Sequence, residues 1–590
     1  MADVGTLASW TAVCFAAWAF IAGLTLRAAG HPARRSAERA LIASAVAAAV
    51  AATALVQLLL VGDVTVNYVA RSIATNLPSP YRVAALWNLP AGAVLPTAAL
   101  VALAGWRASA RAHSSLGVAA TGAIVMALCA ASLTASPFAT LPWVPTDGVG
   151  LSPALQHPLS VVGRVALSMA IAAGGAFVAR TAEAVADGRR DVERTQRAAA
   201  WAIVLFGVAT WATAIGRFAT GTADSPAPAT ALVPALVALM LAWQARGGDA
   251  AAHFQAALGS LGLMSVVLLA GETPGAKAWA LTAFAVVSLG AAASGAAMAA
   301  MNTRSTAVRS LALIGIVLLT GAGGAAWWFS GGASQWLGSA AQWLLIGGGV
   351  ALSAAALIDD LAAGGARLWM SVLPVVLAVV LGVTMRPIVP PAVGWAVVAG
   401  LAVAVSLSRG LAGPALADRR SRALLALSVA LAALGAAGED WARESTVTLA
   451  SGAHATVPVR FGGSYTLTHQ GISRFEDRNA HVQALALEPS RGGRQLALLS
   501  AERRAYVDSR DEVLGETVKR PATQRWGLES LRVRLDDVTA DEGVRLRLTV
   551  VPFSLAWTAS LVLLAAVALQ LTVARVAPAA APSSPESVPA

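Results

Sequence analysis

Residues 40–62 read ALIASAVAAAVAATALVQLLLVG and contain no charged side chain. A transmembrane helix needs about 20 predominantly apolar residues, so this run is long enough to cross a bilayer. Similar runs recur along the 590 residues, of which 57% are hydrophobic and only 12% charged. Soluble proteins carry about 25% charged residues. Lipid must therefore serve as solvent for most of the chain, which is predicted to be a polytopic membrane protein.

The apolar runs on both sides of residues 40–62 set the number of predicted spans. About 15 stretches reach the length needed to cross a bilayer. Lipid admits only helices and closed barrels, and these runs are too long and unpatterned for barrel strands, so each is predicted to be helical. The predicted spans are residues 6–28, 40–62, 86–106, 116–136, 158–180, 198–216, 227–244, 254–271, 278–301, 310–330, 339–358, 367–385, 391–408, 423–438 and 553–576.

A different pattern begins after residue 438. Polar and apolar residues alternate in stretches such as LRVRLDDVTADEGVRLRLTVV (residues 531–551), which is typical of half-buried strands joined by turns. The predicted fold class is an all-α polytopic membrane protein with a small β domain before the last helix. The predicted units are a multi-span helical domain (1–438), the β domain (439–550), a C-terminal transmembrane helix (551–577) and a disordered Pro/Ala/Ser-rich tail (578–590).

The distribution of arginine sets the orientation of the predicted spans. Arginines concentrate in every second loop, as expected for the cytoplasmic loops of a bacterial inner membrane protein. Those loops hold Arg27, Arg34, Arg35, Arg39, Arg107, Arg111, Arg180, Arg189, Arg190, Arg194, Arg197, Arg246, Arg304, Arg309, Arg367, Arg409, Arg419, Arg420 and Arg422. This pattern predicts an N-terminus outside, a C-terminal tail inside, and an extracytoplasmic position for the β domain and for residues 63–85. Topology and membrane lipid thus account for the net charge of +11, and no nucleic-acid partner is expected.

Few side chains inside the predicted spans indicate chemistry. Ionisable residues within a membrane are the usual functional candidates, but Arg164 is close enough to a span end to extend to the interface. Of seven histidines, His157 alone is placed to reach a ligand at the outer membrane face. Capping of the helix that begins at Pro158 is the more ordinary explanation for it. The spacing of His and Cys predicts no metal site, and no catalytic residue is predicted.

The residues alone leave three functions open: a transporter, an assembly factor and a scaffold. The numerous spans and glycine-rich stretches favour a transporter. The lack of midspan charges and of an evident inverted repeat opposes one.

The polar segment that follows residue 62 resembles a known family. It reads DVTVNYVARSIATNLPSPYRVAALW (residues 63–87) and is similar to the first periplasmic loop of the CcmF/NrfE family, the membrane heme-lyase component of bacterial cytochrome c maturation. The matching residues include Asp63, Tyr68, Asn76, Tyr81 and Trp87.

Two further segments carry the resemblance. DGVGLSPALQHPLSVV (residues 147–162) is similar to the second loop of the family and contains Gln156 and His157. In the β domain, Glu502, Arg504 and Tyr506 belong to ERRAY, where the family has a Glu-Lys-Arg-x-Tyr run. The resemblance implies a heme-side outer surface that includes Asp63, Tyr68, Asn76, Tyr81, Trp87, Gln156 and His157. It also implies a partner-binding surface on the β domain with Glu502, Arg504 and Tyr506.

The resemblance implies a component of c-type cytochrome biogenesis that meets heme, other maturation subunits and apocytochrome c on the outer face of the membrane. The heme-handling residues of the family are nevertheless missing. Its tryptophan-rich segment corresponds to GRFATGTADSPAPATALVPALV (residues 216–237), which has no tryptophan. Gly163 stands at the position of one family histidine, and Ala426 lies near another.

Heme iron needs axial ligands such as His, Met or Cys, and no convincing one is found in the chain. We therefore expect the scaffold of a heme-lyase component with degenerate heme chemistry, and heme is implied by resemblance only. Whether the chain is an enzyme stays open. The alternatives are a non-catalytic membrane scaffold or partner-binding assembly factor and, less favoured, a transporter.

Overall fold

The computed structural model describes part of the chain. The described residues are 1–25, 31–74, 77–110, 115–187, 192–222, 346, 350, 373–378, 380, 390–411, 416–459, 463–477, 480–507, 517–539 and 543–573. Most of the predicted spans between residues 227 and 385, the segment matched to the tryptophan-rich motif beyond residue 222, and the C-terminal tail lie outside this set.

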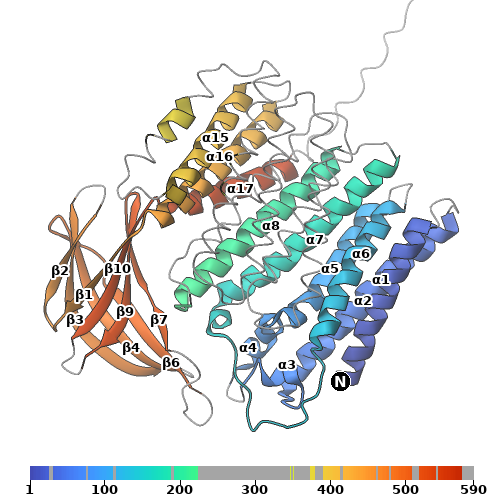
Figure 1. The fold of residues 1–590 in the computed structure, drawn as a ribbon, viewed down its shortest axis with the longest axis horizontal. Helices are drawn as coiled ribbons and strands as arrows, with labels where there is room; N and C mark the ends of the chain where they lie inside the picture. The colour runs from blue at the N-terminus through green and yellow to red at the C-terminus, as the bar shows by residue number, and fades with distance from the viewer. Residues whose placement is uncertain are drawn as a thin grey trace, which may run out of the picture.

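Long apolar helices make up most of the described structure. Two groups stand side by side in Figure 1: α1 (Ala2–Thr25), α2 (His31–Val61), α5 (Pro90–Ser109), α6 (Leu116–Ala135), α7 (Pro158–Asp187) and α8 (Val192–Ala219), then α15 (Pro390–Leu411), α16 (Leu416–Asp440) and α17 (Leu555–Val573). Within the described residues, six helices are long and apolar enough to cross a membrane, and three apolar helices are shorter. These helices make the chain a multi-pass membrane protein.

Small residues let the helices approach closely. Helices in lipid associate mainly through van der Waals packing, which favours glycine and alanine at the contacts. A Cβ atom at Gly23 of α1 would lie 2.8 Å from that of Ala119 on α6, and one at Gly122 would lie 2.8 Å from the backbone nitrogen of Phe20. The alanine-rich sequence thus gives a closely packed bundle.

One predicted span begins later than expected. The sequence predicts a span from residue 86, whereas α5 begins at Pro90. Residues Ala85–Trp87 form a short 3₁₀ helix, η2, and Leu89 is extended with φ −119° and ψ 150°. A residue that precedes proline is driven out of helical geometry, so Pro90 sets the boundary.

The described residues between 443 and 552 form two antiparallel sheets. The strands are β1 (Arg443–Leu449), β2 (His454–Pro458), β3 (Ser464–Asp477), β4 (Ala480–Arg491), β5 (Arg494–Gln495), β6 (Leu499–Tyr506), β7 (Val518–Arg520), β8 (Ala522–Trp526), β9 (Glu529–Val538) and β10 (Val544–Pro552). One sheet has the order β1-β10-β9-β8 and the other β2-β3-β4-β6-β7, with β5 beside β4. Inward leucines such as Leu467, Leu485 and Leu546 are fully buried and form the core of this β domain. The predicted strand pattern is confirmed.

The β domain is fixed to the helices at its two chain connections. Arg532 of β9 is 4% exposed and forms a two-pronged ion pair with Glu439 in the last turn of α16, with Nη1 donating to Oε2 at 2.9 Å. Trp441 and Phe553, which flank the domain, have ring centroids 6.2 Å apart. Figure 1 shows the β domain at the same end of the bundle as the N-terminus and the short helices α3 (Asn67–Ala70) and α4 (Ser79–Ala84).

Candidate functional site

Two loops at this end of the bundle form one unit, called here the loop layer (residues 63–74, 77–89 and 136–157). The two segments are joined through their backbones. The hydrogen bonds are Asn67 N to Ala139 O (2.9 Å), Leu141 N to Thr65 O (2.8 Å), Val149 N to Ala70 O (2.7 Å) and Gly150 N to Ile73 O (3.1 Å). Gly148 fits against the carbonyl oxygens of Ala70 and Ile73, where a side chain would collide with the backbone. The two segments similar to the family loops are therefore one structural element.

Tyr68 is the buried centre of the loop layer. It is 3% exposed, and its hydroxyl group lies 2.8 Å from the carbonyl oxygen of Leu86 and 3.1 Å from that of Ala85. Gly92 on α5 leaves room for this hydroxyl, because a Cβ atom there would overlap the Tyr68 oxygen. Tyr68 therefore ties the first loop to the start of α5, and its buried position gives it a structural role.

Arg82 joins the loop layer to the end of α2. Its Nη1 donates to the carbonyl oxygen of Leu60 and its Nε to that of Leu77, both at 3.0 Å. The last carbonyl groups of a helix lack partners within the helix, and a cation is favourable there. Gly62, with φ +79°, ends α2 in the left-handed conformation that suits glycine.

The other predicted residues of the first loop have varied surroundings. Asp63 turns back on its own segment and accepts a hydrogen bond from the backbone nitrogen of Thr65 at 3.2 Å. Tyr81 and Trp87 are partly buried against the same apolar cluster as Tyr68, and the Trp87 indole nitrogen has no hydrogen-bond partner among the described residues. Asn76 lies outside the described residues.

Asn88 is a residue of the loop layer that the sequence analysis missed. It is buried, and its side chain links the two loops: Oδ1 accepts from Ser152 N at 3.3 Å and Nδ2 donates to Arg71 O at 3.4 Å. The only signal in the sequence was a polar residue directly after Trp87, the last residue of the segment that resembles the family. That position does not indicate which groups Asn88 contacts. Gln156 makes a comparable local contact, from Nε2 to Leu151 O at 3.3 Å.

His157 caps the first turn of α7. Its Nδ1 accepts a hydrogen bond from the backbone nitrogen of Leu159 at 3.2 Å, and Pro158 occupies the first helical position. Burial and the nearby positive charge of Arg520 lower the pKa of His157, so the neutral form that can accept this bond is favoured. The capping explanation accounts for the contact that the structure shows.

The predicted residues of the β domain belong to an ion-pair cluster on strand β6. Arg504 pairs with Glu502 at 2.7 Å and with Asp477 at 2.9 Å, and Arg520 of β7 reaches the same Glu502 oxygen at 3.3 Å. Burial raises the pKa of Tyr506, although the positive charge of Arg504 opposes that shift. Glu502, Arg504 and Tyr506 alternate along β6 and thus point to the same face of the sheet.

Strand β7 brings this cluster to the helical bundle. Gly221, just beyond the end of α8, is packed so closely on β7 that a Cβ atom there would lie 2.7 Å from the backbone nitrogen of Arg520. Arg520 also acts electrostatically on His157. The structure therefore assembles the second loop, the end of α8 and the β6–β7 cluster, which are far apart in sequence, at one end of the molecule.

The position assigned to a family histidine has no room for a ligand. A Cβ atom at Gly163 would lie 2.7 Å from the backbone nitrogen of Thr213 and 2.9 Å from the carbonyl oxygen of Ala209, so α7 and α8 are in direct backbone contact there. Ala426 is fully buried in α16. Among the described residues, no three His, Cys, Asp or Glu side chains are grouped as metal ligands. The residues present at these positions do not fit an axial ligand set for heme iron.

The helical bundle, the loop layer and the inserted β domain define a polytopic membrane protein of the CcmF fold. The solved structure of the cytochrome c heme lyase CcmF matches with a TM-score of 0.68 and 20% sequence identity, over 97% of this chain and 97% of that chain. In sequence, the chain is 34% identical over 139 residues to the cytochrome c-type biogenesis protein CcmF of Escherichia coli (strain K12).

These two similarities confirm the resemblance to a CcmF-type cytochrome c maturation protein. The sequence match covers 20% of this chain and 21% of the Escherichia coli protein, so the chain spans about a fifth of the curated relative that it matches. No family model matches the chain.

Proposed function

We propose that the chain is a CcmF-like component of c-type cytochrome biogenesis, part of a heme attachment or assembly complex, whose own residues do not ligate heme iron. The observation that carries the proposal is the likeness to the cytochrome c heme lyase CcmF over nearly the whole chain. The intact loop layer supports it, because the segments that resemble family loops form one packed unit.

The proposal that this chain has no heme ligand of its own depends on the packing of α7 against α8. If Gly163 occupies the position of a family histidine, an imidazole there must separate α7 from α8, because even a Cβ atom is too close to Thr213. His157 does not substitute for it, since its Nδ1 already accepts the bond from Leu159. Without the iron ligand, the chain has the role of positioning other molecules.

The proposed site is the end of the molecule that carries the loop layer and the β domain. The arginine pattern supports a location of this end on the outer face of a bacterial inner membrane, with the C-terminal tail inside. The heme-side surface is proposed to include Asp63, Asn76, Tyr81, Trp87, Gln156 and His157, with the buried Tyr68 holding the first loop beneath it. The partner surface, for maturation subunits or apocytochrome c, is proposed to be the β6 face with Glu502, Arg504 and Tyr506.

Deletion of the gene tests this function. We expect the deletion strain to lose covalently attached heme from its membrane and periplasmic c-type cytochromes, as measured by heme staining. The wild-type gene should restore it. The double variant Glu502→Gln, Arg504→Gln should restore less heme staining than wild type, while Arg525→Gln, an exposed change on β8, should restore it fully. Unchanged cytochromes in the deletion strain would exclude a role in biogenesis.

A non-catalytic scaffold is the second candidate, and the crowded Gly163 position favours it over direct heme handling. It predicts that maturation subunits or apocytochrome c copurify with the chain while heme does not. Copurification of heme in stoichiometric amount would favour direct handling instead.

A further inference from the structure

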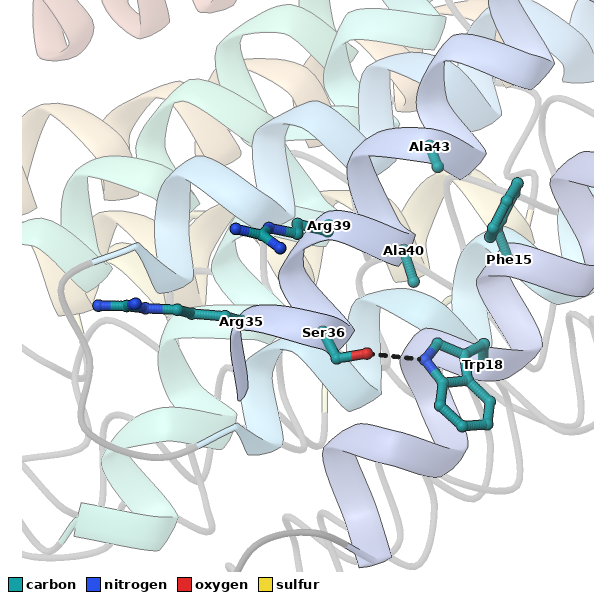
Figure 2. A pocket seen from close by; sticks show the side chains of 7 residues that line it. All are labelled: Phe15, Trp18, Arg35, Ser36, Arg39, Ala40 and Ala43. Atoms are coloured by element: carbon teal, nitrogen blue, oxygen red, sulfur yellow. Dashed lines mark hydrogen bonds between the residues drawn. The ribbon is translucent and has the colours of Figure 1, made fainter. Parts of the chain in front are cut away.

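A groove of about 730 Å³ lies between α1 and α2, far from the loop layer along both helices. It is lined by Phe15 and Trp18 of α1 and by Arg35, Ser36, Arg39, Ala40 and Ala43 of α2 (Figure 2). The groove therefore combines aromatic, small apolar and basic side chains at the end of the helix pair opposite the N-terminus.

The aromatic side chains of the groove are exposed at the molecular surface. Phe15 is 40% exposed and Trp18 is 50% exposed, while Ala40, which also lines the groove, is buried. The Trp18 indole nitrogen donates to Ser36 Oγ at 3.1 Å, which holds the ring against α2 (Figure 2). The apolar part of the groove thus has a fixed shape.

The two arginines of the groove differ from their neighbour Arg34. Arg34 donates to Glu38 at 2.8 Å and to the carbonyl oxygen of Ser109 at 2.9 Å, so its charge is used within the bundle. Arg35 and Arg39 are exposed, and among the described residues neither forms an ion pair. They are one helical turn apart, and Figure 2 shows both extending on the same side of α2, away from the aromatic rings.

The order of these side chains along α2 matches the layers of a lipid. At 1.5 Å per residue, Arg35 and Ala43 are separated by about 12 Å along the helix axis. Arg35 lies near the helix end, where a membrane interface is expected, whereas Ala40 and Ala43 belong to the apolar run that crosses the bilayer. The charged end of the groove is thus at headgroup depth and the apolar end at acyl-chain depth.

We propose that this groove binds an anionic phospholipid of the surrounding bilayer. The phosphate is held by the guanidinium groups of Arg35 and Arg39, which suit phosphate geometry, and an acyl chain crosses Ala40 and Ala43 toward Phe15. Interfacial arginines that merely extend to water would need neither the aromatic wall nor the fixed indole. The proposal needs only that α1 and α2 span the membrane, and it does not depend on the proposed function.

Native mass spectrometry of the full chain, released from nanodiscs containing phosphatidylglycerol and phosphatidylcholine, tests the proposal. Wild type is expected to retain one phosphatidylglycerol in preference to phosphatidylcholine. Each of Arg35→Gln and Arg39→Gln should weaken retention about fivefold, the contribution typical of one basic residue at an anionic membrane surface. Inorganic phosphate added to phosphatidylcholine nanodiscs should leave no phosphate bound to the released protein.

Arg107→Gln is the matched control, because Arg107 is an exposed arginine at the same end of the bundle, in the last turn of α5. It should retain phosphatidylglycerol as wild type does. All variants should have the same unfolding temperature in phosphatidylcholine alone. Equal temperatures would show that the variants fold as wild type does. Equal retention of both lipids by wild type, or equal losses in Arg107→Gln and in the Arg35 and Arg39 variants, would overturn the proposal.

Discussion

Gly163 of α7 lies in direct contact with Thr213 of α8. A Cβ atom at residue 163 would stand 2.7 Å from the Thr213 backbone nitrogen, closer than Cβ atoms approach other groups in proteins. Backbone contacts of this kind allow tight packing of membrane helices, and they also exclude any larger side chain. The scaffold and a ligand at this position are therefore mutually exclusive in this chain.

Side chains introduced at Gly163 should destabilise the bundle. Gly163→Ala is expected to cost about 1–3 kcal/mol, the usual range for overpacking, and Gly163→His more. Thermal unfolding in detergent measures the effect. Gly207→Ala is the control, because a Cβ atom there meets only the ends of two flexible side chains, Leu564 at 3.1 Å and Leu561 at 3.7 Å. Equal unfolding temperatures for Gly163→His and wild type would show that the site can hold an imidazole.

Removal of the Tyr68 hydroxyl group should loosen the loop layer. Tyr68→Phe leaves the carbonyl oxygen of Leu86 without its 2.8 Å partner, in a buried setting. The expected cost is about 1–3 kcal/mol. Faster cleavage of residues 63–89 in limited proteolysis would accompany it. Trp143→Phe, at a 75% exposed position in the second loop, should change neither measurement.

His157 should make stability depend on pH. Its pKa is lowered in the folded protein, by burial and by Arg520, from an ordinary value of about 6.5. As pH falls, the unfolded chain therefore binds a proton at His157 before the folded protein does. The contribution of His157 to the free energy of unfolding is complete above about pH 6.5 and is lost as pH falls toward the folded pKa. His157→Asn keeps a capping oxygen without a titrating group.

Unfolding temperatures between pH 8 and pH 5 check this prediction. The loss on acidification should be smaller in His157→Asn than in wild type, and the two should agree at pH 8. His157→Ala should be less stable at pH 8 by about 0.5–2 kcal/mol, the cost of a lost cap. A steeper acid loss in His157→Asn would contradict the assigned role.

The Arg532–Glu439 ion pair should hold the β domain to α16. Removal of one member of a buried pair costs about 3–5 kcal/mol, and the lower end applies because the Glu439 side chain is 19% exposed. Arg532→Gln should therefore lower the unfolding temperature and expose the junction at residues 440–443 to protease. The double variant Arg532→Met, Glu439→Gln should recover much of this loss, and Arg525→Gln should behave as wild type.

The sequence predicted the elements of the fold better than their contacts. Apolar length identifies spans such as 116–136, because lipid forces such a run to be helical, and α6 occupies Leu116–Ala135. Alternating polar and apolar residues in 531–551 predict strands. The alternation identifies the buried face of each strand, but not the strand that pairs with it. It therefore missed that β10, the last strand, pairs with β1, the first.

The candidate site was less predictable because its contacts join distant segments. Resemblance selected Tyr68, but it could not show that Tyr68 is buried against η2. The cap that His157 provides to α7 was predictable, because Pro158 marks the start of a helix. Asn88 and Arg520 were missed because their partners are set by packing of the second loop and of β7. The crowding at Gly163 likewise depends on the approach of α8, which a glycine in an apolar run does not reveal.

Heme titration of the purified full chain tests the central claim most directly. The account predicts that heme added in detergent gives no stoichiometric Soret band of a histidine-ligated iron, and that the spectrum is the same for wild type and His157→Asn. A stoichiometric band of a six-coordinate heme that is lost in His157→Asn would contradict the claim that this chain retains the CcmF scaffold without its own iron ligand.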